Sequence, residues 1–276
     1  MKNKSSFSLI MYVFALCGIS ASTVAQTDVK PAAAPAVAPA TAKAWDSAFE
    51  SLSYDKDGNT LPYRFLKPAK VEAGKTYPLL IFLHGAGERG TDNKAQMKHS
   101  VSDIVKIGYE KNPFFMIVPQ CPKNRRWVEV DWGANSHTMP ETPSIPFLLL
   151  FDVIYKVSKD FPVDPKRIYV MGISMGGFGT WDAISRSPDL FAAAIPVCGG
   201  ADTVQAAKLA KFPIWVFHGG NDTTVKTKRS RDMVEAIKKA GGDPKYTEYP
   251  GVGHGSWAQT FSNPEVIEWL FTQVRK

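Results

Sequence analysis

Apolar residues along this chain come in short unbroken runs, which alternate with longer stretches of helical spacing. Unbroken apolar runs are typical of strands that are covered on both faces, as in a parallel sheet. The runs predict strands at residues 77–83, 114–119, 168–171, 192–197 and 214–217. A further strand at residues 245–249 is more polar, so it should lie nearer an edge of the sheet.

A hairpin is predicted ahead of these runs. Short strands around residues 49–54 and 61–66 flank Asp57-Gly58-Asn59, whose residue types suit a tight turn between antiparallel strands. The chain is therefore expected to contain eight strands.

Helical patterns fill the segments between the strands. The clearest covers residues 145–159, and others are expected at 178–186, 202–211, 227–240 and 264–275. Strands that alternate with helices favour a mainly parallel sheet with helices on both faces. We predict an α/β architecture with an eight-stranded mostly parallel sheet.

A glycine-rich motif follows the fifth predicted strand. Residues 172–176 read G-x-S-x-G with Ser174 at the centre. In a nucleophile elbow the serine occupies a strained turn with very small neighbours, and the next backbone N–H, here that of Met175, becomes an oxyanion donor. The motif occurs by chance in about one chain in ten of this length, so its position between a strand and a helix is what favours the elbow.

A serine nucleophile needs a base and an acid from later strand ends. Asp222 follows the strand at 214–217, and His254 lies on a glycine-lined loop after the last strand. The chain order Ser174, Asp222, His254 is that of the α/β-hydrolase fold. Each assignment has an alternative: Asp222 could cap the next helix, and Asp202 is a second candidate for the acid.

Four other histidines compete with His254 for the role of base, namely His84, His99, His137 and His218. His84 and His218 both stand at strand ends before a glycine, where an imidazole typically supports the loop backbone. We therefore predict His254 as the base.

The second oxyanion donor is expected in the loop after the strand at 77–83. Residues 84–90 read His-Gly-Ala-Gly-Glu-Arg-Gly, and the N–H of Ala86 is the best candidate. The alternative is an ordinary glycine-rich loop. The spacing fits neither a phosphate-binding loop nor a dinucleotide fingerprint, and the sequence carries no metal-binding motif, so no cofactor and no metal are expected.

These motifs together resemble a known family. Residues 84–89, 119–122, 164–169, 172–181, 191–200, 218–225 and 249–257 are similar to secreted bacterial α/β-hydrolases of the carboxylesterase and dienelactone hydrolase-like group, often labelled prolyl oligopeptidase family. The resemblance runs from residue 77 to residue 269. It implies that the family's nucleophile, acid and base fall on Ser174, Asp222 and His254. Gly255 is a departure, because such relatives are expected to carry an aspartate after the histidine.

The substrate is harder to predict. A long segment at residues 119–143, here called the 119–143 loop, lies above strand ends and carries Trp127 and Trp132. With Trp257 these could form an aromatic wall for a sugar or phenolic ester, although the tryptophans could equally anchor the loop. Acetyl or feruloyl esters of polysaccharides are the substrates that fit.

Two other functions stay open at this point. Peptidases share this catalytic domain, but they usually carry an extra domain that filters substrates, for which the short N-terminal portion has no room. A non-catalytic hydrolase-fold binding module would be expected to lack the serine, the acid or the base.

The N-terminus predicts export. Lys2 and Lys4 precede an apolar run at residues 9–17, and small residues end at Ala25, so residues 1–25 read as a signal peptide. The apolar run is too short for a membrane anchor. A lipoprotein signal centred on Cys17 is an alternative, but Leu16 occupies the position before the cysteine where a small residue is needed. A Pro/Ala-rich linker follows at residues 26–43, and the catalytic domain occupies residues 44–276. The protein should be secreted or periplasmic, without stable membrane insertion.

The net charge and the two cysteines argue against a nucleic-acid partner and against a disulfide bond. The formal net charge of +7 falls to +5 once Lys2 and Lys4 are removed (7 − 2 = 5), and the basic residues are scattered, so no nucleic-acid partner is expected. Cys121 and Cys198 follow strands that are separated by others, which predicts two free thiols.

Overall fold

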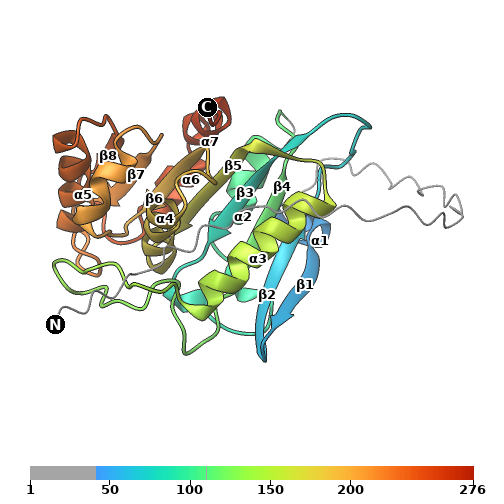
Figure 1. Ribbon diagram of the computed structural model, residues 1–276, viewed down its shortest axis with the longest axis horizontal. Coiled ribbons are helices and arrows are strands. Elements are labelled where there is room, and N and C mark those ends of the chain that lie inside the picture. Colours follow the sequence, from blue (N-terminus) through green and yellow to red (C-terminus); the bar gives the residue numbers. More distant parts are fainter. Residues whose placement is uncertain (1–41, 110) are drawn as a thin grey trace, which may run out of the picture. The chain divides into compact units, whose positions relative to one another are not determined.

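Eight strands form one sheet, in the order β1-β2-β4-β3-β5-β6-β7-β8. The computed structural model describes residues 42–109 and 111–276, which belong to one compact unit (Figure 1). The predicted signal peptide and nearly all of the predicted linker lie outside the described residues. The strands are β1 Glu50–Lys56, β2 Asn59–Leu66, β3 Tyr77–Leu83, β4 Phe115–Pro119, β5 Val163–Ile173, β6 Ala193–Val197, β7 Trp215–Gly219 and β8 Lys245–Tyr249.

The sheet is mostly parallel, as predicted. Strands β4, β3, β5, β6, β7 and β8 run parallel, while β1 and β2 are antiparallel to each other and β2 is antiparallel to β4. Asp57 and Gly58 both have positive φ and connect β1 to β2 in a two-residue turn, which confirms the predicted hairpin. Strand β8 is an edge strand, as its polar sequence suggested.

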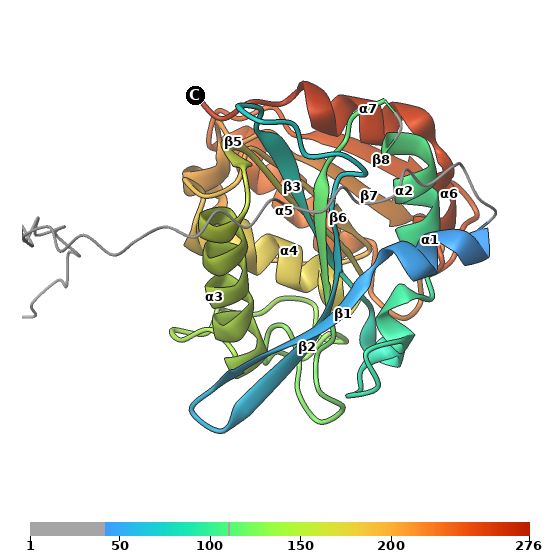
Figure 2. The same ribbon diagram turned by 90° about the vertical axis from the view of Figure 1, so that its right-hand side faces the viewer.

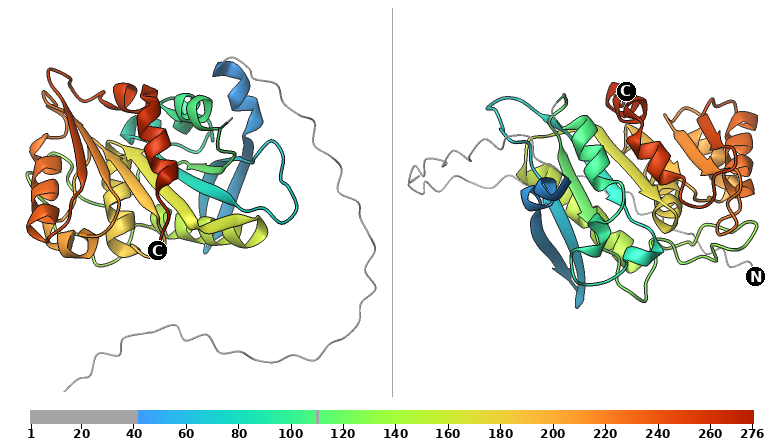
Figure 3. Two further views of the ribbon diagram at one scale, coloured as in Figure 1. Left: turned by 90° about the horizontal axis from the view of Figure 1, so that it is seen from above. Right: turned by 180° about the vertical axis from the view of Figure 1, so that it is seen from behind.

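Helices cover both faces of the sheet (Figure 2). One face packs against α3 Ile145–Asp160, α4 Met175–Arg186 and α5 Lys228–Lys239, and the other against α2 Val101–Gly108, α6 Trp257–Ser262 and α7 Pro264–Thr272. The view from behind has α2 and α7 in front of the strands (Figure 3). Alternate residues of β3 divide between the two cores: Leu79 and Ile81 face α3, whereas Leu80 and Phe82 face α2.

The structure corrects several predicted elements. The segment 202–211 forms a 3-10 helix, η3 Thr203–Leu209, whose first turn is tied down by the Asp202 side chain. The last helix ends at Thr272, because the N–H of Arg275 donates to the Lys166 carbonyl instead of continuing the helix. The helices α1 Ala42–Ala48, α2 and α6 and the two short 3-10 turns η1 Ala86–Glu88 and η2 Ala95–Met97 were not predicted.

Cys121 and Cys198 are both buried and free, as the strand order predicted. Among the described residues, no helix combines the length and the apolar character that crossing a membrane would require.

The order of the strands changes direction at β3, which marks a switch point of the sheet. After β3 the chain moves to one side to form β4, and it then returns to the other side of β3 to form β5. Ligands of open α/β sheets bind at such switch points, beyond the carboxyl ends of the strands. The loops after β3 and β5 therefore meet where a binding site is expected.

Candidate active site

Ser174 stands in a strained turn between β5 and α4. Its backbone angles are φ 52° and ψ −116°, a conformation that L-residues seldom adopt. The turn is closed by glycines, because a Cβ on Gly172 would lie 2.8 Å from the Leu83 carbonyl oxygen, and one on Gly176 would overlap the same oxygen severely. The sequence of small residues is thus what allows the serine to project from the end of the strand.

Asp222 follows β7, and its side chain is fully buried. One carboxylate oxygen, Oδ1, accepts hydrogen bonds from the N–H groups of Thr224 at 2.9 Å and Val225 at 3.0 Å. The other oxygen, Oδ2, faces two imidazoles, His254 at 2.7 Å and His218 at 3.2 Å. The backbone of its own loop therefore fixes the orientation of the carboxylate.

His254 links the acid to the serine. Its Nδ1 lies 2.7 Å from Asp222 Oδ2, and its Nε2 lies 2.8 Å from Ser174 Oγ. The loop that carries His254 is tied to the loop of Asp222, because Asn221 donates its N–H to the Val252 carbonyl at 2.9 Å. The structure brings together all three residues that the sequence predicted for nucleophile, acid and base.

The environment keeps the Asp222 carboxylate ionised. Burial alone would raise the pKa of Asp222, but hydrogen bonds from His218, His254 and the Val225 N–H outweigh it and hold that pKa well below its usual range. A carboxylate at Nδ1 leaves Nε2 of a neutral His254 as the acceptor that faces the serine hydroxyl. The arrangement can therefore remove a proton from Ser174.

Two predicted oxyanion donors border the serine. Met175 is the first residue of α4 and Ala86 is the first residue of η1. An N–H in the first turn of a helix has no acceptor within the helix, so both groups are available to an incoming oxygen. Ala86 lines the pocket that contains Ser174.

A pocket of about 450 Å³ opens beside the serine and His254. Trp132 and Trp257, two of the three predicted substrate-binding tryptophans, are part of its wall. The prediction for Trp127 is wrong. Trp127 is completely buried in the core, and its Nε1 donates to the His84 carbonyl at 3.1 Å, so it anchors the 119–143 loop from within.

Side-chain contacts hold the 119–143 loop against the helices of one face. The N–H of Met139 donates to Asp202 Oδ2 at 3.0 Å, and Arg229 of α5 donates to the Ala134 carbonyl at 2.9 Å. Arg186 of α4 donates to the Pro140 carbonyl at 2.6 Å. Asp202, the rival candidate for the acid, is thus engaged in capping η3 and fixing this loop.

Glu88 is a pocket residue that the sequence analysis did not assign. It lines the pocket with Ser174 although its side chain is only 8% exposed, and its one hydrogen-bonding or ionic side-chain contact among the described residues is with His99 Nε2 at 3.5 Å. A buried carboxylate with so few donors keeps spare acceptor capacity. Glu88 could have been predicted as a pocket residue, because it belongs to the glycine-rich segment 84–90.

The remaining histidines have other surroundings. His84 Nε2 accepts the Cys121 N–H at 2.9 Å, and burial lowers the pKa of His84 to about 4. His218 contacts a backbone carbonyl as predicted, that of Val225 at 2.9 Å, but it also reaches Asp222. Burial, followed by the charge of Arg229, lowers the pKa of His137 to about 4.

One group of described side chains has the donor types of a metal site. Atoms of Cys198, Asp222 and His254 lie within 4.8 Å of one another. Both nitrogens of His254 already contact Asp222 and Ser174, and burial raises the pKa of the Cys198 thiol, which opposes the thiolate that a metal needs. We assign no metal to this group.

An eight-stranded α/β sheet with a serine on the elbow after β5 defines the α/β-hydrolase class. Residues 149–266 match the model of the Dienelactone hydrolase family, in agreement with the resemblance seen in the sequence.

Similar proteins include several esterases. The chain is 38% identical over 106 residues to the bifunctional acetylxylan esterase/xylanase XynS20E of Neocallimastix patriciarum, covering 36% of this chain and 15% of that protein. It is 30% identical over 236 residues to an uncharacterized secreted protein of Arthroderma benhamiae, covering 71% and 24%. A crystal structure of a thermostable esterase superposes with a TM-score of 0.77 at 39% identity, covering 83% of this chain and 64% of that one. The chain therefore spans only a small part of the length of the Neocallimastix and Arthroderma proteins.

Proposed function

We propose that this protein is a secreted serine esterase that hydrolyses carboxylic esters through an acyl-enzyme. The observation that carries the proposal is the continuous hydrogen-bonded series from Ser174 Oγ through His254 to Asp222, at 2.8 and 2.7 Å. The match to a dienelactone hydrolase family domain and the similarity to esterases support the same chemistry.

The reaction follows from the roles of these groups. His254 Nε2 takes the proton from Ser174 Oγ as that oxygen attacks the ester carbonyl, and Asp222 stabilises the imidazolium that forms. The N–H groups of Met175 and Ala86 hold the oxyanion. His254 then gives its proton to the leaving alcohol, and water, activated by the same imidazole, releases the acid from Ser174.

Ester-linked polysaccharide groups, such as acetyl or feruloyl esters, are the proposed substrates. Trp132 and Trp257 line the pocket and offer apolar contacts to a sugar or phenolic ring. The guanidinium of Arg126 lies over the Trp132 ring, 4.3 Å from its centroid, and adds a hydrogen-bond donor beside it. Glu88, with its single long contact to His99, offers an acceptor for a substrate hydroxyl. A bifunctional acetylxylan esterase among the similar proteins supports this substrate class.

Export is part of the proposal. The signal-peptide pattern at residues 1–25, the linker at residues 26–43 and the secreted protein among the similar sequences support a secreted or periplasmic catalytic domain at residues 44–276.

Two tests separate this function from its rivals. Ser174→Ala should reduce hydrolysis of p-nitrophenyl acetate by at least about a thousandfold while leaving the melting temperature near that of the wild type. A panel of acetyl, feruloyl, aliphatic and peptide substrates distinguishes an esterase from a peptidase. Activity towards peptides alone would overturn the esterase assignment, and a protein inert towards the whole panel would point to a binding module.

Glu88→Gln tests the substrate class. The amide has nearly the shape of the carboxylate but is a weaker acceptor, so the Michaelis constant for a sugar ester should rise while that for p-nitrophenyl acetate stays the same. An equal change for both substrates would contradict a contact between Glu88 and substrate hydroxyls.

A further inference from the structure

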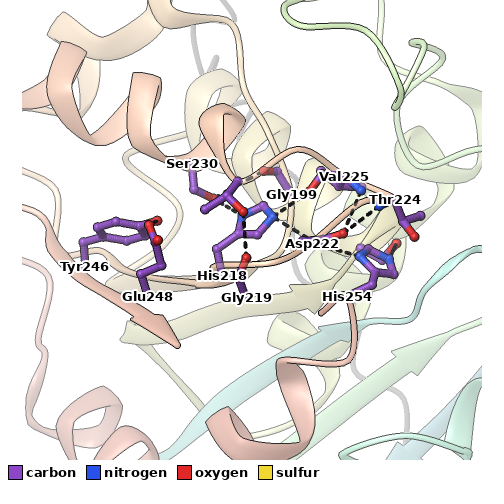
Figure 4. Close-up of polar contacts among 12 residues, drawn as sticks. Gly199, His218, Gly219, Asp222, Thr224, Val225, Ser230, Tyr246, Glu248 and His254 are labelled. Atoms are coloured by element: carbon purple, nitrogen blue, oxygen red, sulfur yellow. Dashed lines mark hydrogen bonds and ion pairs between the residues drawn. The ribbon is translucent and has the colours of Figure 1, made fainter. Parts of the chain in front are cut away.

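His218 is a second, completely buried histidine beside the proposed acid. It belongs to β7, four residues before Asp222, and its Nε2 lies 3.2 Å from Asp222 Oδ2. The same oxygen faces Nδ1 of His254 on its other side. The carboxylate is therefore held between two imidazoles (Figure 4). Of the two, His254 is the one that contacts Ser174.

The surroundings of His218 decide which nitrogen carries its proton. Nε2 faces only acceptors, the Val225 carbonyl at 2.9 Å and the Asp222 carboxylate, so Nε2 must be protonated. On the other side Nδ1 lies 2.7 Å from the Ser230 hydroxyl, whose alternative acceptor, the Gly199 carbonyl, is 3.4 Å away. The contact with Nδ1 is the shorter of the two, so the geometry favours a hydroxyl that donates to Nδ1 and the Nε2–H tautomer of His218.

We propose that His218 is a positioning residue of the esterase, which holds Asp222 by donating Nε2–H to the oxygen that His254 also uses. Ser230 fixes the tautomer of His218, His218 fixes Oδ2 of Asp222, and Asp222 orients His254. This proposal rests on the proposed function. His218 does not line the pocket, so it acts through Asp222 and not on the substrate.

The second donor also limits how strongly the carboxylate favours the imidazolium of His254. A carboxylate that shares its charge with two donors is a weaker base than one with a single donor. Removing the His218 donor should therefore stabilise protonated His254, which is the inactive form before attack. The acidic limb of the pH profile of kcat/KM should move to higher pH.

Other ionisable groups around His218 keep a constant charge in the range of such an assay. Glu248 of β8 pairs with His218 in the sheet, and its hydrogen bond with Arg231 of α5 is the main cause that lowers the pKa of Glu248 to about 2. Burial raises the pKa of Tyr246 and that of the Cys198 thiol far above neutral. These neighbours therefore do not mask an effect of His218 on Asp222.

A matched pair of variants tests the proposal. His218→Gln keeps an N–H donor near the position of Nε2, whereas His218→Met has a similar length without a donor. We expect His218→Met to move the acidic limb upward by about one pH unit and to lower kcat about tenfold, with KM unchanged. His218→Gln should retain the wild-type limb and most of the rate. A His218→Met enzyme that melts earlier but keeps the wild-type pH profile would overturn the proposal.

A measurement on the wild-type protein covers the case in which His218→Met does not fold. In protein labelled with ¹⁵N-histidine, nuclear magnetic resonance should find Nε2 of His218 protonated and Nδ1 unprotonated from about pH 6 to pH 8. A spectrum with Nδ1 protonated and Nε2 bare would overturn the proposal. This measurement needs no catalysis, so a failure of the esterase assignment itself would be seen separately, as a wild-type protein without activity.

Discussion

Two kinds of loop border the pocket, and they are held in different ways. The turn at Ser174 is confined by main-chain atoms, since Gly172 and Gly176 leave no room for a side chain. The 119–143 loop is confined by side chains from other elements, among them Arg229 and Asp202. The turn that carries Ser174 is therefore fixed by the main chain, whereas the 119–143 loop is fixed by side-chain contacts that a substitution can change.

The largest effect is expected from Gly176→Ala. Its Cβ would overlap the Leu83 carbonyl oxygen, which cannot move without disrupting β3. We expect a loss of about 3 kcal/mol or more in the free energy of unfolding, measured by urea denaturation, and no detectable ester hydrolysis.

Gly255→Ala is the matched control for that variant. Gly255 also lies beside a residue of the proposed site, His254, but a Cβ on Gly255 would have no atom within 4 Å. Stability and activity should therefore stay close to wild type. Equal losses in the two variants would contradict the claim that backbone crowding confines the turn.

A smaller and different effect is expected from Arg229→Met. Arg229 is buried, donates to the Ala134 carbonyl and also contacts His137, so its loss should loosen the 119–143 loop. KM for a sugar ester should rise about tenfold while kcat changes much less. Lys226→Ala, which removes an exposed contact to Asn135 in the same loop, should have little effect on either constant. A fall in kcat without a change in KM would contradict the assignment of the loop to substrate binding.

The stability of the protein should also depend on pH. His137 in the 119–143 loop has a folded pKa of about 4, below its ordinary value of 6.5, because burial and then Arg229 oppose its charge. Its neutral form contributes stability that is complete above about pH 6.5 and is lost as the pH falls towards 4. The melting temperature of the wild type should therefore fall more steeply over this range than that of His137→Asn. His84 contributes the same trend to both proteins, and parallel curves would contradict the role of His137.

The sequence was a good guide where the backbone decides the structure. Apolar runs predicted five of the eight strands, the turn residues 57–59 predicted the hairpin strands, and a more polar segment predicted the last strand. Glycines around Ser174 predicted a crowded turn that the structure contains. The positions of Asp222 and His254 at strand ends followed from the same topology, because parallel strands bring their carboxyl ends to one edge.

Side-chain orientation in the 119–143 loop could not be predicted in the same way. Trp127 and Trp132 are five residues apart in an irregular segment, where no period tells an inward from an outward position. Trp127 is buried and Trp132 lines the pocket. Glu88 was missed for a related reason, since burial of a carboxylate depends on loops that come from distant parts of the chain.

The most direct test of the account is covalent labelling of Ser174. A fluorophosphonate probe reacts with a serine hydroxyl only when a neighbouring base has activated it. Mass spectrometry of peptides from the labelled wild-type protein should find the adduct on Ser174, and Ser174→Ala and His254→Ala should not be labelled. A wild-type protein that resists the probe, or one labelled at a different serine, would contradict the proposal that Ser174, His254 and Asp222 act together as a serine esterase.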